Sequence, residues 1–304
     1  MQSQRSFFLQ LILLLAYTNL SISSSPGSNG STYKSIRDLD QYGSSPQINN
    51  ARLASTLHGT LTIAALSIPS NSIIVVSIER KLTGVIIPPN KGKVHIIAQE
   101  HGKKVNALVG SGLQSDITYI VSLLRKHASE IWERYDSIPS LDRVAMDATQ
   151  VMLCFMGYAV QDEINDGTRG VLSDTSGNGD KSDTISIGRP LACNILCLEV
   201  GSSMRIMNDM KLVDPSGTIS ESLVGRAIGR GSNKANEFLR QQWRDDLTTK
   251  EIEDVCINVA RETVREEAFL SNDEIEHACI VCEVLNEKGL TMRRLPFLPS
   301  MKEQ

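Results

Sequence analysis

Several common functional signatures are missing from this sequence. Aromatic residues make up only 5% of the 304 residues. The formal net charge is −4 at pH 7, which excludes a broad basic surface for binding nucleic acid. No G-x-G-x-x-G, P-loop, H-E-x-x-H or G-x-S-x-G motif stands in a strand–helix context that would make it productive. We accordingly expect no cofactor and no nucleic-acid partner.

Cysteine is too scarce for a disulfide framework, since six cysteines are spread over a chain of 304 residues. Cys279 and Cys282 form a C-x-x-C, but they lie in an apolar, strand-like run. Residues three apart on a strand point to opposite faces, so the two thiols are poorly placed to share a metal. Cys193 and Cys197 lie in a similar run. We expect buried, reduced thiols and no metal site.

Residues 1–25 contain the chain's one long apolar run. Arg5 precedes the apolar segment Phe7–Ala16, and small and polar residues follow it. This pattern is typical of a secretory signal and is too short for a membrane span. Asn19 and Asn29 each open an N-x-Ser sequon. The alternative is a wrongly assigned first exon.

Two further segments lack a regular apolar pattern. Residues 26–46 are predicted to be a flexible leader that ends at Ser45-Pro46. Residues 160–188 are acidic and rich in Gly, Ser and Asp, which predicts a solvated insertion. Asp174 begins half of a calcium-loop pattern there, but Ile185 occupies the position of the essential Glu, so we expect no calcium site.

The remaining chain alternates between strand and helix patterns. Strands are predicted at 59–66, 72–78, 93–98, 107–112, 191–199, 204–210, 218–224, 225–228 and 276–285. Helices are predicted at 47–57, 115–135, 140–156, 232–243 (with Ser232 as cap) and from Thr248, where Glu251 completes a capping box. This order predicts an α/β (α+β) fold, a four-layer αββα sandwich over residues 47–290, followed by a polar tail at 291–304.

Short motifs along this layout resemble those of proteasome subunits, which belong to the N-terminal-nucleophile hydrolases. The sequence Ser111-Gly112-Leu113-Gln114-Ser115-Asp116 resembles S-G-L-x-x-D of that family. The sequence Asp214-Pro215-Ser216-Gly217, followed by Ala227-Ile228-Gly229, resembles the D-P-S-G and A-I-G signature of its α-type subunits. Arg189-Pro190 stands where those subunits have R-P-F-G. The resemblance covers residues 37–285.

The N-terminal part of the resemblance is more divergent. Gln47-Ile48-Asn49-Asn50-Ala51 is similar to the α-type Q-V-E-Y-A, and Pro46 stands for the proline of F-S-P. Asp38 follows Arg37 where Y-D is expected, so the gate-forming tyrosine is absent. The resemblance makes Asp38, Pro46, Gln47 and Ala51 candidates for gating and ring assembly. The run Asp142–Met146 is similar to D-R-V-A-M of the α type numbered three in mammals, the seventh ring position.

Thr60 stands at the position of the β-type nucleophile, with Lys93 as a plausible activating lysine. The acid expected on the second strand falls at Ile78, and the serine expected at the strand-to-helix corner falls at Arg230. The D-x-x-S-G-G motif is also absent. We therefore expect no catalytic residue. The glycines around Arg230 suggest a tight corner or, alternatively, an anion site.

The resemblance implies a non-catalytic α-ring subunit of the 20S core proteasome in the cytoplasm and nucleus, active in ubiquitin-dependent degradation. This compartment conflicts with the signal-like residues 1–25. Implied partners are the other α and β subunits of the twenty-eight-subunit particle and activator C-termini, with no membrane partner. Lys93 or Lys91 would receive the activator's terminal carboxylate, unless Lys93 is only a solvated surface lysine. Two alternatives are an active β-type threonine peptidase and a secreted or organellar binding module.

Overall fold

The computed structural model describes residues 39, 45–80, 92–156, 189–201, 209–220, 223–267, 269–271, 275 and 278–297. The predictions for residues 1–25, for most of the leader 26–46 including Asp38, for Lys91 and for the insertion 160–188 therefore fall outside the described residues. No helix in the described ranges is both long and apolar enough to cross a membrane.

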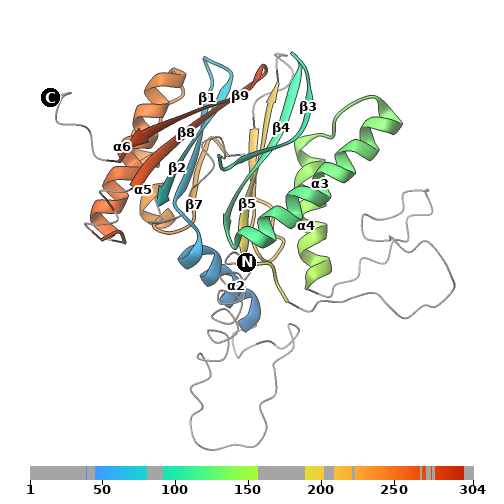
Figure 1. Cartoon of the computed structure of the whole chain (residues 1–304), viewed down its shortest axis with the longest axis horizontal. Helices are drawn as coiled ribbons and strands as arrows, with labels where there is room; N and C mark the ends of the chain where they lie inside the picture. Colours follow the sequence, from blue (N-terminus) through green and yellow to red (C-terminus); the bar gives the residue numbers. More distant parts are fainter. Residues whose placement is uncertain are drawn as a thin grey trace, which may run out of the picture. The chain divides into compact units, whose positions relative to one another are not determined.

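Two antiparallel sheets form the centre of the described fold. The five-stranded sheet has the order β7-β1-β2-β8-β9, with bounds Gly225–Ile228, Thr62–Ser67, Ser72–Arg80, Ala278–Asn286 and Gly289–Pro296. The four-stranded sheet has the order β3-β4-β5-β6, with bounds Val94–Glu100, Lys104–Gly112, Cys193–Gly201 and Asp209–Val213. Figure 1 shows the two sheets side by side between two pairs of helices.

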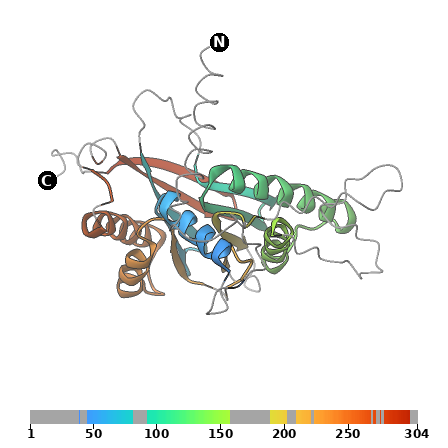
Figure 2. The same cartoon turned by 90° about the horizontal axis from the view of Figure 1, so that it is seen from below.

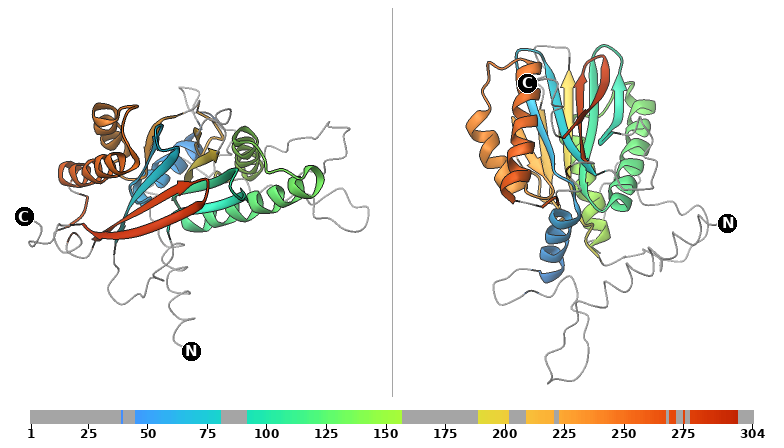
Figure 3. Two further views of the ribbon diagram at one scale, coloured as in Figure 1. Left: turned by 90° about the horizontal axis from the view of Figure 1, so that it is seen from above. Right: turned by 60° about the vertical axis from the view of Figure 1, so that its left-hand side comes forward.

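Each sheet carries one helix pair on its outer face. Helices α3 (Gln114–Tyr135) and α4 (Leu141–Phe155) pack on the four-stranded sheet. Helices α5 (Ser232–Gln242) and α6 (Thr249–Glu267) pack on the five-stranded sheet. Figure 3 shows these outer layers from two further directions. The predicted four-layer αββα sandwich is confirmed.

The apolar runs of the central strands reflect burial on both faces. Along β2, Ile74, Val76 and Ile78 belong to the core beneath α5 and α6. Ile73 and Val75 alternate with them and belong to the core between the two sheets. Alternation of side chains along a strand thus divides one hydrophobic run between two cores. A third core lies between the four-stranded sheet and its own helices.

Four local predictions are wrong. The strand predicted to end at Met210 is β6, which continues to Val213 because Leu212 and Val213 still pair with β5; residues 204–208 of the prediction fall outside the described residues. Within 218–224 the described residues contribute one isolated bridge, between Ile219 and Val213. Gly231, with φ of 74°, is the N-cap of α5, so Ser232 is its first residue.

The polar tail predicted from residue 291 is the fourth error. Residues Gly289–Pro296 form β9, which pairs along β8 through a tight hairpin between Asn286 and Gly289. The prediction failed because β9 is an edge strand that is half-exposed along its length, so it lacks the apolar pattern of the central strands. Its Arg293 forms an ion pair with the buried Glu253 of α6.

Candidate functional site

Helix α2 (Pro46–His58) lies outside the two helix pairs and contacts β4 and β5. Figure 2 shows it across one end of the sheets. Pro46 is its first residue, where the missing N–H costs nothing. The buried face carries the small residues Ala51 and Ser55, which allow close approach, and Gln47 lies half-buried in the first turn. Leu53 is 57% exposed and Leu57 is 48% exposed.

The signature loop Asp214–Gly217 is organised by the Asp214 carboxylate. Oδ1 accepts hydrogen bonds from the Ser216 N–H at 2.9 Å, the Ser216 hydroxyl at 2.5 Å and the Thr218 N–H at 3.0 Å. Gly217 has φ of 79°, in the left-handed region that favours glycine. Its carbonyl accepts a hydrogen bond from Thr149 Oγ1 of α4 at 3.1 Å. The loop therefore joins β6 to α4.

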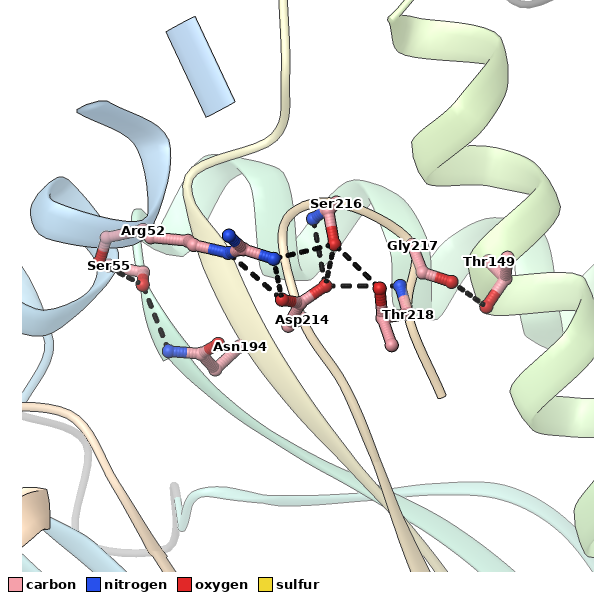
Figure 4. A network of polar contacts seen from close by, with 8 residues as sticks. All are labelled: Arg52, Ser55, Thr149, Asn194, Asp214, Ser216, Gly217 and Thr218. Carbon is pink, nitrogen blue, oxygen red and sulfur yellow. Dashed lines mark hydrogen bonds and ion pairs between the residues drawn. The ribbon is translucent and has the colours of Figure 1, made fainter. Parts of the chain in front are cut away.

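The second oxygen of Asp214 holds α2. Arg52 donates to Oδ2 through Nε at 3.0 Å and Nη2 at 2.7 Å, and also through Nη2 to Ser216 Oγ at 2.9 Å. Figure 4 shows this network between α2 and the loop. Burial favours a raised pKa for Asp214, but the hydrogen bonds from Ser216, Arg52 and Thr218 outweigh it and lower the pKa. The carboxylate is thus held charged beside its arginine.

A second contact fixes the inner face of α2. Ser55 donates its hydroxyl to the Arg52 carbonyl at 2.8 Å and accepts a hydrogen bond from Asn194 Nδ2 of β5 at 2.9 Å. Asn194 lies beside Ser111 of β4 in the strand register. Figure 4 shows the Arg52 side chain extending from α2 to Asp214 and the Ser55 hydroxyl bonded to Asn194.

Asp116, the last residue of the motif Ser111–Asp116, is joined to Arg189. Asp116, which is 3% exposed, accepts two hydrogen bonds from the Arg189 guanidinium at 3.0 and 2.7 Å and one from the Ala192 N–H at 3.0 Å. Gly112 has φ of 132°, and a Cβ there would lie 2.2 Å from the Ala192 carbonyl oxygen. The glycine is needed for the close approach of β4 to β5.

Lys93 lies half-buried just before β3, so it is not a fully solvated lysine. Burial lowers its pKa, although the charges of Glu79 and Glu283 act in the opposite sense. Glu283 of β8 is fully buried and accepts hydrogen bonds from the Lys93 N–H at 2.8 Å and the Val94 N–H at 3.1 Å. A Cβ on Gly92 would lie 2.0 Å from its Oε1.

Ile78 and Arg230 have roles that the sequence comparison did not predict. Ile78 faces α5 and α6 in the core, whereas the next residue, Glu79, supplies a carboxylate whose charge acts on Lys93. Arg230 lies at the predicted tight corner, between Gly229 and Gly231, both with positive φ. Its guanidinium donates to the Leu57 carbonyl. The Thr60 hydroxyl is buried and has no hydrogen-bond partner among the described residues.

Three residues of this region were missed from the sequence, namely Arg52, Asn194 and Glu283. Each interacts with a residue more than 130 positions away, so local spacing contained no signal for the pairing. Glu283 alone offered a hint, because a carboxylate inside an apolar strand is costly unless it is paired.

Two comparisons relate this chain to known proteins. Residues 186–280, which contain Arg189, Asp214 and Arg230, match the family model described as "Proteasome subunit". The chain is also 22% identical over 202 residues to "Proteasome subunit alpha type-5" of Drosophila melanogaster. That alignment covers 66% of this chain and 71% of the relative.

Proposed function

This chain is a divergent α-type member of the proteasome subunit family, and on this premise we propose that it is a non-catalytic, structural subunit of a proteasome α ring. Support comes from α2, which is anchored by Arg52 and Asp214 on one side and presents Leu53 and Leu57 on the other. An anchored helix with an exposed apolar pair is suited to contact a neighbouring subunit. The ring would in turn stack on a β ring in the 20S core particle.

We propose two further duties for this subunit. The leader 26–46 would contribute to closing the axial pore. Lys93, or Lys91 two residues earlier, would receive the C-terminal carboxylate of an activator. The half-buried ammonium of Lys93 has two carboxylate neighbours, so an incoming carboxylate would compete with Glu79 and Glu283. The particle would act in ubiquitin-dependent degradation in the cytoplasm and nucleus.

The ring position stays open. The D-R-V-A-M resemblance at Asp142–Met146 predicts the type numbered three, whereas the relative described above is of type 5. Both share the α type, and the proposal rests on that type alone.

The experiment is native purification of the tagged full chain from its own cells, followed by mass spectrometry of the complexes. We expect the chain in a large particle with other proteasome subunits, and recovery as a monomer alone would overturn the proposal. A variant with Leu53→Asp and Leu57→Asp should fail to enter the particle while keeping its circular-dichroism spectrum. Ile68→Asp, at a site 51% exposed in the β1–β2 turn, is the matched control.

A β-type threonine peptidase is the second candidate, and it is favoured by the Glu79 charge beside Lys93 and the unpartnered Thr60 hydroxyl. Such an enzyme requires a free amine at Thr60. N-terminal sequencing of the assembled chain distinguishes the two, because the α-type function predicts that α2 remains joined to Thr60. A mature N-terminus at Thr60 would replace our proposal with this one.

A further inference from the structure

We propose that Arg230 is a positioning residue that fixes the C-terminal end of α2, so that the Leu53–Leu57 face is held in one orientation for a second proteasome subunit. The inference rests on the proposed ring function for its partner. The contact between Arg230, in the corner between β7 and α5, and α2 does not depend on that function.

Arg230 provides three donors to the end of α2. Its Nε and Nη2 donate to the Leu57 carbonyl at 3.1 and 2.5 Å, and its backbone N–H donates to the Gly59 carbonyl at 3.1 Å. The last carbonyls of a helix have no partner within the helix. A guanidinium is a planar fork of donors that cannot lose its charge, and a cation is favoured at the negative end of the helix dipole.

The C-terminal end of α2 has no local capping motif that could replace this contact. Its C-cap, Gly59, is extended, with φ of −72° and ψ of 138°, so the left-handed turn that usually satisfies terminal carbonyls is absent there. At the other end, the N-cap Ser45 makes no side-chain capping bond and the first turn holds no acidic residue. A helix of 13 residues is marginal on its own, so α2 depends on its tertiary anchors.

The corner that carries Arg230 is itself closely packed against the end of α2. A Cβ on Gly229 would lie 2.2 Å from the Thr60 carbonyl oxygen, and one on Gly59 would lie 2.2 Å from Ser111 Oγ. The Ser111 hydroxyl donates to the same Thr60 carbonyl at 2.9 Å. The backbone of Arg230 is therefore placed by the two sheets, and its side chain transmits that placement to α2.

Anchors at separate points then determine the orientation of α2. The Arg52–Asp214 pair and the Ser55–Asn194 hydrogen bond hold the side of the helix, and Arg230 holds its C-terminal end. Without Arg230 the last turn, which carries Leu57, would lose its side-chain anchor. With Arg230 in place, Leu53 and Leu57, one turn apart, stay on the outer surface. A prearranged contact face loses less freedom when a partner binds.

The test is hydrogen–deuterium exchange of the full-length chain, comparing Arg230→Ala, Arg230→Lys and the control Arg244→Ala. Arg244 is an exposed arginine whose ion partner is Asp246. With Arg230→Ala we expect amide protection over residues 53–58 to fall about tenfold, which corresponds to about 1.4 kcal/mol of local opening. Arg230→Lys should lose less of this amide protection than Arg230→Ala, because the lysine ammonium can still donate to one carbonyl. Unchanged protection in Arg230→Ala would overturn the inference.

Protection over β2 and β8 in the same experiment separates loosening of α2 from loss of the fold. If those strands are loosened as much as α2, Arg230 is a general stabilising residue and the inference is wrong. Entry of each variant into the native particle gives the second readout, with Arg230→Ala expected to enter less than Arg244→Ala. If α2 loosens but the wild-type chain joins no particle, the positioning role stands and the proposed ring function fails.

Discussion

Asp116 and Arg189 form a two-bond ion pair across 73 residues of sequence, with the carboxylate almost fully buried. The pair connects the start of α3 to the chain just before β5. The contact with Asp116 raises the pKa of Arg189, chiefly through their hydrogen bond. Two motifs that the sequence presents separately are thus parts of one structural link.

Arg189→Ala should lower the free energy of unfolding by about 3 kcal/mol, because it leaves the buried Asp116 carboxylate without its cation and with only the neutral donors Ala192 N–H and Ser115 Oγ among the described residues. The free energy of unfolding in urea measures the effect. Arg134→Ala, at an exposed position in the last turn of α3, should change it by less than about 0.5 kcal/mol. Equal effects of the two variants would contradict the assigned role of the pair.

The anchoring of α2 by Asp214 should be lost in acid. The folded-state pKa of Asp214 is lowered, so its contribution is complete above the unfolded-state pKa of about 3.9 and disappears as the pH falls through the folded-state value. Amide exchange of α2 between pH 7 and pH 2, corrected for intrinsic exchange rates, should therefore show constant protection until the acid end of the range.

Asp214→Asn is the matching variant for this prediction. This substitution should lower the free energy of unfolding by about 1–3 kcal/mol at neutral pH, because the hydrogen bonds from Arg52 lose their charged acceptor. The difference in stability from the wild type should shrink as the pH falls below about 4. A difference that is the same at pH 7 and pH 2 would show that the charge of Asp214 contributes nothing. Asn50→Ala, on the exposed side of α2, is the control.

Glu283→Ala should lower the free energy of unfolding by about 2–4 kcal/mol, because the backbone N–H groups of Lys93 and Val94 lose their acceptor inside the fold. Glu283→Gln keeps one acceptor oxygen and should cost less. Burial raises the pKa of Glu283, so in the wild type this group lowers stability as the pH rises from about 4.3 through its folded-state pKa. Glu283→Gln should remove that slope, and an unchanged slope would contradict the prediction.

Thiol labelling should divide the cysteines into two groups. Cys193, Cys197, Cys256 and Cys282 are buried, whereas Cys154 and Cys279 are partly exposed. Burial raises the pKa of Cys197 and of Cys282 to about 12, so neither forms the reactive thiolate at neutral pH. Iodoacetamide and peptide mass spectrometry on the native chain should find modification at Cys154 and Cys279 only. Rapid labelling of Cys197 in the folded chain would contradict the described core.

Much of the layout was predictable because local patterns report burial directly. The apolar stripe of α3, the β-branched runs of β1 and β2 and the helix start at Thr248 each involve residues near in sequence. The Thr248 N–H donates to the Glu251 carboxylate, as half of the predicted capping box requires. The half-exposed edge strand β9 escaped prediction because an edge strand has no continuous apolar face.

The sequence by itself determined the layers of this protein and the loop at Asp214–Gly217, since periodicity and turn chemistry act over a few residues. Only the tertiary structure decided which charges meet. Arg52 reaches Asp214 across 162 positions, and Arg230 reaches Leu57 across 173. Strand alternation likewise directs Ile78 into the core, whereas Glu79 forms an ion pair with Arg294 and its charge acts on the pKa of Lys93. Such pairings depend on sheet register and helix placement, which are fixed by packing of the whole domain.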